Sequence, residues 1–252
     1  MDTWKYFDIT HRDHDIMNPV SSAALDQVIA LLELPRGAKV LDIACGKAEL
    51  LVRLAEKYGI TGTGVDISPF CIRDARDRAR RRVPEAALTF VEGDGAAVPF
   101  TPESFDLACC FGASWVFKGH RGTLRALAHW ARPGGLVLVA EPFWKRPPDP
   151  AYLQAESMSA TDYETHAGNV AAGVAEGLIP LFATTSTEAD WDRYEGLQWR
   201  AAEKYALESP QDPDVPALLS RMRGSRDTYL RWGRETFGDG IYLFRTRPAA
   251  SR

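Results

Sequence analysis

The chain has 252 residues, of which 45% are hydrophobic, and a formal net charge of −4. This length allows one large domain or two small ones, and the apolar fraction is ample for a buried core. The slight acidic excess argues against a general nucleic-acid or membrane-surface binder, which would usually carry a basic surface, and it favours small-molecule partners.

The cysteines and the N-terminus point to a cytoplasmic protein. Cys45, Cys71, Cys109 and Cys110 lack metal-ligand spacing, and no metal site is expected. Buried, reduced thiols are the simple interpretation. The residues after Met1 contain no apolar signal core, and no run approaches the ~20 apolar residues that span a bilayer.

The N-terminal segment, residues 1–19, is polar but carries embedded aromatic side chains such as Trp4 and Phe7. These aromatics need a surface to cover, so the segment is expected to pack as an arm onto the rest of the chain. A helix capped by Ser21 or Ser22 follows and ends before Pro35-Arg36-Gly37.

A regular alternation of strand and helix patterns then indicates an α/β fold with a mostly parallel, doubly wound sheet. Strands are expected at 39–44, 61–66, 88–92, 105–111 and 135–141. Helices are expected at 47–58, 69–82 and 121–131. The arginines of the second of these helices alternate with aspartates, which is typical of a solvated helix face.

The alternation is interrupted at Pro147-Pro148-Asp149-Pro150. Beyond it we expect helices at 151–177, 191–207 and 217–235 and strands at 179–187 and 241–246. The helical stretches 151–177 and 210–235 are expected to cap the ligand-binding edge of the sheet. Trp191–Glu195 is expected to begin a helix and to serve as scaffold. The whole chain, 1–252, is interpreted as a single domain with an arm or lid at 1–35, a cofactor-binding core at 36–146, and cap helices with C-terminal strands at 147–252.

Two aspartates define the most informative pattern in the chain. Asp42 lies just before the turn that follows the first strand, where a carboxylate would repel a phosphate and attract an ammonium group. Asp66 ends the next strand, where a carboxylate can hold both hydroxyls of a ribose. Because ligands bind at the carboxyl ends of such strands, this spacing predicts a site for an adenosine cofactor that also carries a cationic amino-acid end.

A dinucleotide-dependent dehydrogenase is the nearest enzymatic alternative. Its Gly-x-Gly-x-x-Gly turn places a pyrophosphate on a helix N-terminus. The comparable stretch, Ala44–Glu49, keeps only Gly46, and Asp42 lies close to where the phosphates would bind. The sequence therefore disfavours a dinucleotide.

The successive motifs Val40–Leu50, Gly64-Val65-Asp66, Glu92–Gly95 and Phe105–Gly112 resemble those of class I S-adenosylmethionine-dependent methyltransferases. Further segments resemble a poorly characterised bacterial subgroup of these enzymes: His14–Pro19, Gly59–Asp66, Gly112–Val116, Pro133-Gly134-Gly135, Glu141–Trp144 and Trp191–Glu195. The resemblance covers most of the chain and implies a Rossmann-like, seven-stranded sheet in which the last strand lies antiparallel between the fifth and sixth.

The resemblance also implies roles for individual residues. Asp42 would accept a hydrogen bond from the cofactor's amino group, and Asp66 would bind the ribose hydroxyls. Asp94 would receive the adenine amino group. The other implied contacts are Ala44, Cys45 and Gly46 to the methionine part, Ile67 and Gly95 to the adenine, and Phe111 and Gly112 beside the sulfonium. Ala44 and Ala48 stand where the family has, or often has, glycine; alanine is tolerable there if its φ is negative.

Methyl transfer from a sulfonium depends on alignment and desolvation, and a base is needed only if the nucleophile must lose a proton. The candidate catalytic residues are His14, Glu141 and His120. Each has a plainer alternative: His14 as a lid residue that packs or binds substrate, Glu141 as a group that orients a loop, and His120 as the start or cap of a helix.

Aromatic residues near the predicted ligand edge are candidates for a substrate pocket, with core packing as the alternative: Tyr6, Trp115, Phe143, Trp144 and Tyr152. The sequence thus predicts an enzyme that transfers a methyl group from S-adenosylmethionine to an O, N or S atom of a small molecule, leaving S-adenosylhomocysteine. A catalytically idle regulatory protein that binds these compounds and an RNA or protein methyltransferase are the alternatives. No nucleic-acid or membrane partner is expected, and a homo-oligomer is compatible with the sequence.

Overall fold

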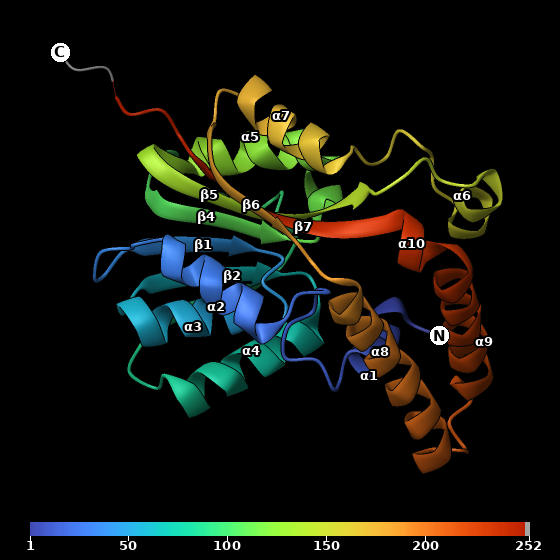
Figure 1. The fold of residues 1–252 in the computed structure, drawn as a ribbon. Helices are drawn as coiled ribbons and strands as arrows, with labels where there is room; N and C mark the ends of the chain where they lie inside the picture. The colour runs from blue at the N-terminus through green and yellow to red at the C-terminus, as the bar shows by residue number, and fades with distance from the viewer. Residues whose placement is uncertain (250–252) are drawn as a thin grey trace.

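Seven strands form one sheet in the computed structural model, which describes residues 1–249. They are β1 (Lys39–Ile43), β2 (Thr61–Asp66), β3 (Ala87–Glu92), β4 (Phe105–Phe111), β5 (Ala131–Trp144), β6 (Ile179–Thr185) and β7 (Phe237–Arg245). Their order is β3-β2-β1-β4-β5-β7-β6, and β7 runs antiparallel to both β5 and β6 (Figure 1). The predicted doubly wound sheet and the position of its last strand are confirmed.

The strand order reverses between β1 and β4, which pair in parallel through Val40–Leu107 to Ile43–Cys110. In an open α/β sheet, the loops that leave two such strands diverge and open a crevice at their carboxyl ends. The turn after β1 and the segment after β4 therefore border the same space.

The helical segments between and beyond the strands are mostly those that the sequence pattern predicts. They are α1 (Thr3–Thr10), α2 (Ser22–Leu31), α3 (Glu49–Tyr58), α4 (Pro69–Arg82), η1 (Ser114–Phe117), α5 (His120–Trp130), α6 (Pro150–Glu156), α7 (His166–Ala175), α8 (Glu188–Glu208), α9 (Val215–Thr228), η2 (Tyr229–Gly233) and α10 (Arg234–Thr236).

Helices cover both faces of the sheet. Helices α2, α3 and α4 lie on one face, and α5 and α7 lie on the other (Figure 1). Alternate residues of β1 point to opposite faces of the sheet, where two separate apolar cores lie. Val40 belongs to one core, whereas Leu41 and Ile43 belong to the other. This alternation, with all three side chains fully buried, fixes the register of β1 because a one-residue slip would exchange the two faces.

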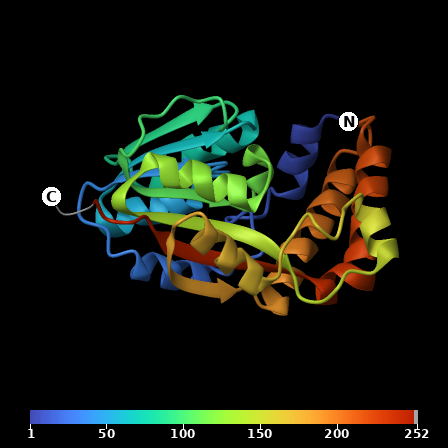
Figure 2. The same ribbon diagram turned by 90° about the horizontal axis from the view of Figure 1, so that it is seen from above.

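The remaining helices form a cap beyond the carboxyl ends of β1 and β4. Helices α1, α6, α8, α9 and α10 gather on this side in both views (Figures 1 and 2). Tyr6 and Ile9 of α1 are buried against Ala202 of α8 and Leu218 of α9. The expected packing of the N-terminal arm onto the rest of the chain is confirmed.

The prediction of one helical stretch at 151–177 is wrong in two respects. Ser157 takes a left-handed conformation with φ 55° and ends α6, and a new helix, α7, begins only after Thr165 caps it. In addition, α7 packs on the face of the sheet beside α5 and does not join the cap (Figure 2). Within residues 1–249, no helix is both long and apolar enough to cross a membrane.

Candidate active site

The turn after β1 is tighter than the sequence predicts. Ala44, Gly46 and Ala48 all have positive φ, at 55°, 53° and 59°. The condition set for alanine, a negative φ, is therefore not met at either position. Left-handed conformations cost an L-residue roughly 1–2 kcal/mol, so the turn holds its two alanines under strain.

Asp66 ties this turn to β2. Its Oδ2 accepts a hydrogen bond from the backbone N–H of Gly46 over 2.9 Å, and its Oδ1 accepts one from the N–H of Ser68 over 2.8 Å. Burial raises the pKa of Asp66, and the two backbone hydrogen bonds oppose that rise. Each oxygen keeps a lone pair for a further donor.

Asp42 is the other buried carboxyl group at this edge. It is 2% exposed, and its Oδ1 has no hydrogen-bond partner among the described residues. Burial, reinforced by the charge of Asp66, raises the pKa of Asp42 to about 7. An unpaired buried carboxyl oxygen is costly, so this position favours a ligand that brings a cationic donor.

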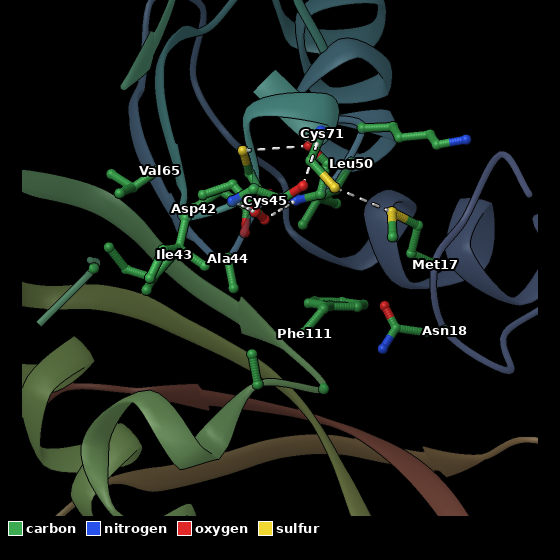
Figure 3. Close-up of a pocket in the computed structure, with 18 of the residues that line it drawn as sticks. Met17, Asn18, Asp42, Ile43, Ala44, Cys45, Leu50, Val65, Cys71 and Phe111 are labelled. Atoms are coloured by element: carbon green, nitrogen blue, oxygen red, sulfur yellow. Dashed lines mark hydrogen bonds between the residues drawn. The ribbon is translucent and has the colours of Figure 1, made fainter. Parts of the chain in front are cut away.

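Both aspartates border a cavity of about 270 Å³ at the carboxyl ends of β1, β2 and β4 (Figure 3). All ten residues predicted to contact the cofactor line it: Asp42, Ala44, Cys45, Gly46, Asp66, Ile67, Asp94, Gly95, Phe111 and Gly112. The sequence spacing therefore brings together one continuous set of side chains and backbone.

The N-terminal arm forms the opposite wall. Met17 and Asn18 face the turn and Phe111 in Figure 3, and Met17 Sδ lies 3.8 Å from Cys71 Sγ. Lys47, which is buried, donates from Nζ to the carbonyl oxygen of His11 over 2.9 Å. The residue after the tight point of the turn thus holds the arm over the cavity.

The cavity fits S-adenosylmethionine. The unpartnered Oδ1 of Asp42 matches the ammonium group, and the remaining lone pairs of Asp66 match two ribose hydroxyls. Asp94 already accepts from the N–H of Ala96 through Oδ1, which leaves Oδ2 for another donor. The carboxyl groups of Asp42, Asp66 and Asp94 on one cavity favour a cationic ligand over a pyrophosphate.

Comparisons with known proteins agree with this geometry. A family model described as a methyltransferase domain matches residues 40–135. YjhP of Escherichia coli, described as uncharacterized, is 30% identical over 249 residues, which cover 98% of this chain and 100% of YjhP. The crystal structure of an S-adenosylmethionine-dependent methyltransferase from Thiobacillus denitrificans, in complex with S-adenosyl-L-homocysteine, is 30% identical with a TM-score of 0.89, covering 98% of this chain and 100% of that one.

The chain belongs to the class I S-adenosylmethionine-dependent methyltransferases. The predictions of the family, of an enzyme and of S-adenosylmethionine as its cofactor are confirmed. This methyltransferase is also 26% identical to the 27-O-demethylrifamycin SV methyltransferase of Amycolatopsis mediterranei over 218 residues, which cover 79% of this chain and 75% of that protein.

The three residues predicted to be catalytic do not line the cavity. His14 is buried, and its Nε2 lies 2.9 Å from the backbone oxygen of Tyr194. Glu141 accepts from Ser114 Oγ over 3.0 Å, and its other oxygen lies 3.7 Å from Nδ1 of His120, the first residue of α5. Roles for His14, Glu141 and His120 in proton transfer therefore stay predictions.

Of the aromatic residues predicted to bind substrate, Trp115 lines the cavity and is 63% exposed. The others pack within the cap and the ends of the long strands and are buried: Tyr6, Phe143, Trp144 and Tyr152. The rings of Trp144 and Tyr152, for example, meet edge to face with centroids 6.3 Å apart. Their role toward substrate stays a prediction.

Several cavity residues are not among the predicted site residues. Trp4, Phe7 and His11 come from α1 and its C-cap, and Tyr194 comes from α8. Two signals in the sequence bear on them. The arm carries aromatic residues with no other surface to cover, and Tyr194 lies in one of the segments that resemble the bacterial subgroup.

Proposed function

We propose that this methyltransferase methylates a small organic molecule bound between the cofactor and the N-terminal arm. The observation that carries the proposal is that aromatic side chains line the cavity in addition to the predicted cofactor contacts. Trp4, Phe7 and Trp115 line it beside the predicted cofactor contacts. Aromatic side chains on the wall of the cavity suit an acceptor with a largely apolar frame.

Within this proposal, bound S-adenosylmethionine supplies a methyl group on a positively charged sulfur, which leaves as a neutral thioether. Asp42 binds the ammonium group, Asp66 the ribose hydroxyls and Asp94 the adenine amino group. Phe111 and Gly112 would lie beside the sulfonium. Residues 1–35 act as a lid, because the arm contributes Met17 and Asn18 to the wall opposite the turn.

The protein's contribution to rate is then mainly alignment and exclusion of water. In-line displacement needs the nucleophile opposite the departing sulfur, and an apolar wall removes the water that would otherwise solvate it. The acidic net charge of −4 and the relationship to an enzyme named for a rifamycin substrate both support a small-molecule acceptor.

The test is a transfer assay with methyl-labelled S-adenosylmethionine. Phenols, amines, thiols and carboxylic acids are supplied alongside transfer RNA and a mixture of unfolded proteins. Label recovered in the organic extract with at least one small acceptor is the expected result. Label confined to RNA or protein, or no transfer to any acceptor while the cofactor binds, would overturn the proposal.

A further inference from the structure

A histidine from the arm and a tyrosine from the cap meet at the cavity. His11 is the C-cap of α1, and its Nε2 lies 2.9 Å from the hydroxyl oxygen of Tyr194 on α8. The two residues are 183 positions apart in sequence, and both line the cavity. His11 is 3% exposed, so the pair is held in place by packing as well as by the hydrogen bond.

The hydrogen bonds around His11 allow one consistent assignment of donors and acceptors. Its Nδ1 lies 3.2 Å from the carbonyl oxygen of Phe7, which can only accept, and 3.0 Å from Thr10 Oγ1. Thr10 donates its own proton to the carbonyl of Tyr6 over 3.0 Å, so its oxygen is also free to accept. Nδ1 therefore carries the proton of the neutral ring, Nε2 is bare, and the Tyr194 hydroxyl must donate to it.

This direction leaves the Tyr194 oxygen with unused lone pairs and no proton to give. Burial first, and then the charges of His14 and Lys47, lower the pKa of His11 to about 3, so the ring is neutral at physiological pH. The pair consequently presents a fixed hydrogen-bond acceptor, which recognises a ligand that donates.

We propose that Tyr194, oriented by His11, accepts the hydrogen bond of an uncharged hydroxyl group on the methyl acceptor and so places its oxygen against the methyl group. This inference rests on the proposed function and narrows it to hydroxyl acceptors carried on an apolar or aromatic frame. It makes Tyr194 a residue that touches substrate and His11 a positioning residue behind it.

The charges around the cavity favour an uncharged acceptor over an anion. Among the lining residues within the described part of the chain, 1–249, Lys47 is the one lysine or arginine. Its Nζ is already engaged with the carbonyl of His11 and lies 3.6 Å from Asp74. A carboxylate or phosphate acceptor would therefore find no free lysine or arginine among the described lining residues.

The proton balance gives the pair a function with an oxygen nucleophile that it would not have with a nitrogen nucleophile. As the C–O bond forms and the C–S bond breaks, the hydroxyl proton passes to Tyr194 Oη, and the proton of Tyr194 passes to His11 Nε2. A protonated ether is a far stronger acid than an imidazolium ion, so even His11 with its lowered pKa takes that proton. An alkylammonium product is a weaker acid than an imidazolium ion and would keep it.

The experiment uses three matched probes: p-cresol, 4-methylanisole and p-toluate. Their affinities are measured by ligand-observed NMR titration against the full chain saturated with S-adenosylhomocysteine. Proteins compared are the parent, Tyr194→Phe, His11→Gln and His11→Ala. Tyr205→Phe is the matched control, because its hydroxyl lies on the same helix but bonds Asp212 away from the cavity.

The parent and the control should bind p-cresol ~10-fold more tightly than 4-methylanisole, the worth of one hydrogen bond. Tyr194→Phe should lose that preference and His11→Ala should reduce it. His11→Gln should restore most of it, because its amide oxygen can accept from Tyr194. The extra methyl group of 4-methylanisole also makes it larger than p-cresol. This size difference is the same for parent and variant, so it cancels when their p-cresol to 4-methylanisole affinity ratios are compared.

Equal preference in the parent and in Tyr194→Phe, tighter binding of p-toluate than of p-cresol, or no binding of any probe would overturn the proposal. Binding of S-adenosylhomocysteine is measured first in every protein. Failure of the parent to bind S-adenosylhomocysteine would contradict the proposed function itself. If the parent binds S-adenosylhomocysteine but shows no preference for p-cresol over 4-methylanisole, only the role of Tyr194 is contradicted.

Discussion

Asp66 accepts a hydrogen bond from the backbone N–H of Gly46 over 2.9 Å, so one carboxylate both fixes the turn after β1 and faces the cavity. The link explains how a turn that holds Ala44 and Ala48 at positive φ keeps its shape. Asp66 is therefore proposed to bind the ribose and also holds the turn after β1 in place.

Asp66→Ala should weaken binding of S-adenosylhomocysteine by ~1–3 kcal/mol, the range for hydrogen bonds to a charged group. Calorimetric titration measures the change. Asp106→Ala is a suitable control, because that carboxylate accepts from the N–H of Lys39 at the opposite end of β1. Unchanged affinity in Asp66→Ala would remove its proposed role toward ribose.

Affinity for S-adenosylhomocysteine should rise with pH through neutrality, because an ammonium group pairs with the ionised form of Asp42, whose pKa is raised to about 7. Below that pH, binding must first remove a proton, so affinity should fall by up to about tenfold per pH unit. Titrations at pH 6 and pH 8 measure the effect. Asp42→Asn should bind more weakly and lose the dependence; a parent protein with a flat profile would contradict the pairing.

Replacing Ala44 by glycine should stabilise the protein. Its φ of 55° is strained for alanine and not for glycine, so the substitution relieves strain in the folded state. Glycine is also more flexible in the unfolded chain, which costs free energy on folding, and the net gain in stability is about 0.5–1 kcal/mol. Urea unfolding gives the free energy of unfolding. Ala206→Gly in the regular helix α8 is the control and should lose a similar amount. A loss of stability in both variants would contradict the strained turn.

Asp239→Asn should stabilise the ligand-free protein at pH 8 more than at pH 5. Asp239 is 2% exposed with an unpartnered Oδ1, and burial, with the charge of Glu141, raises its pKa to about 8. A carboxyl group whose pKa is raised on folding lends stability at low pH and loses it as pH rises through the folded value. Thermal unfolding of the parent and Asp239→Asn at the two pH values measures this effect. A stability difference between the two proteins that is the same at pH 5 and pH 8 would contradict a buried, unpaired carboxyl group at Asp239.

The grouping of the residues predicted to contact the cofactor could be anticipated because it depends on rules that are local in the sequence. Asp42 and Asp66 each end a strand, and parallel strands deliver their carboxyl ends to one edge. The spacing of such residues therefore predicts a common location, and all ten predicted contacts line one cavity.

The meeting of His11 and Tyr194, which are proposed to act on the acceptor, was not predictable in the same way. His11 and Tyr194 meet only because α1 packs against α8, which depends on tertiary contacts between Tyr6, Ala202 and Met222. His14 attracts attention as a titratable group in the arm, yet the C-cap of α1 directs His11 toward the cavity. The positive φ of Ala44 could not be predicted from the sequence either, because the small size of a side chain does not determine the backbone conformation.

The most direct measurement is a calorimetric titration of the protein with S-adenosylmethionine and S-adenosylhomocysteine, with NAD as the control ligand. The cavity bordered by Asp42, Asp66 and Asp94 predicts binding of the first two at micromolar concentration and none of NAD. Binding of NAD, or failure of both adenosyl ligands to bind, would contradict the assignment of this cavity to the methyl donor.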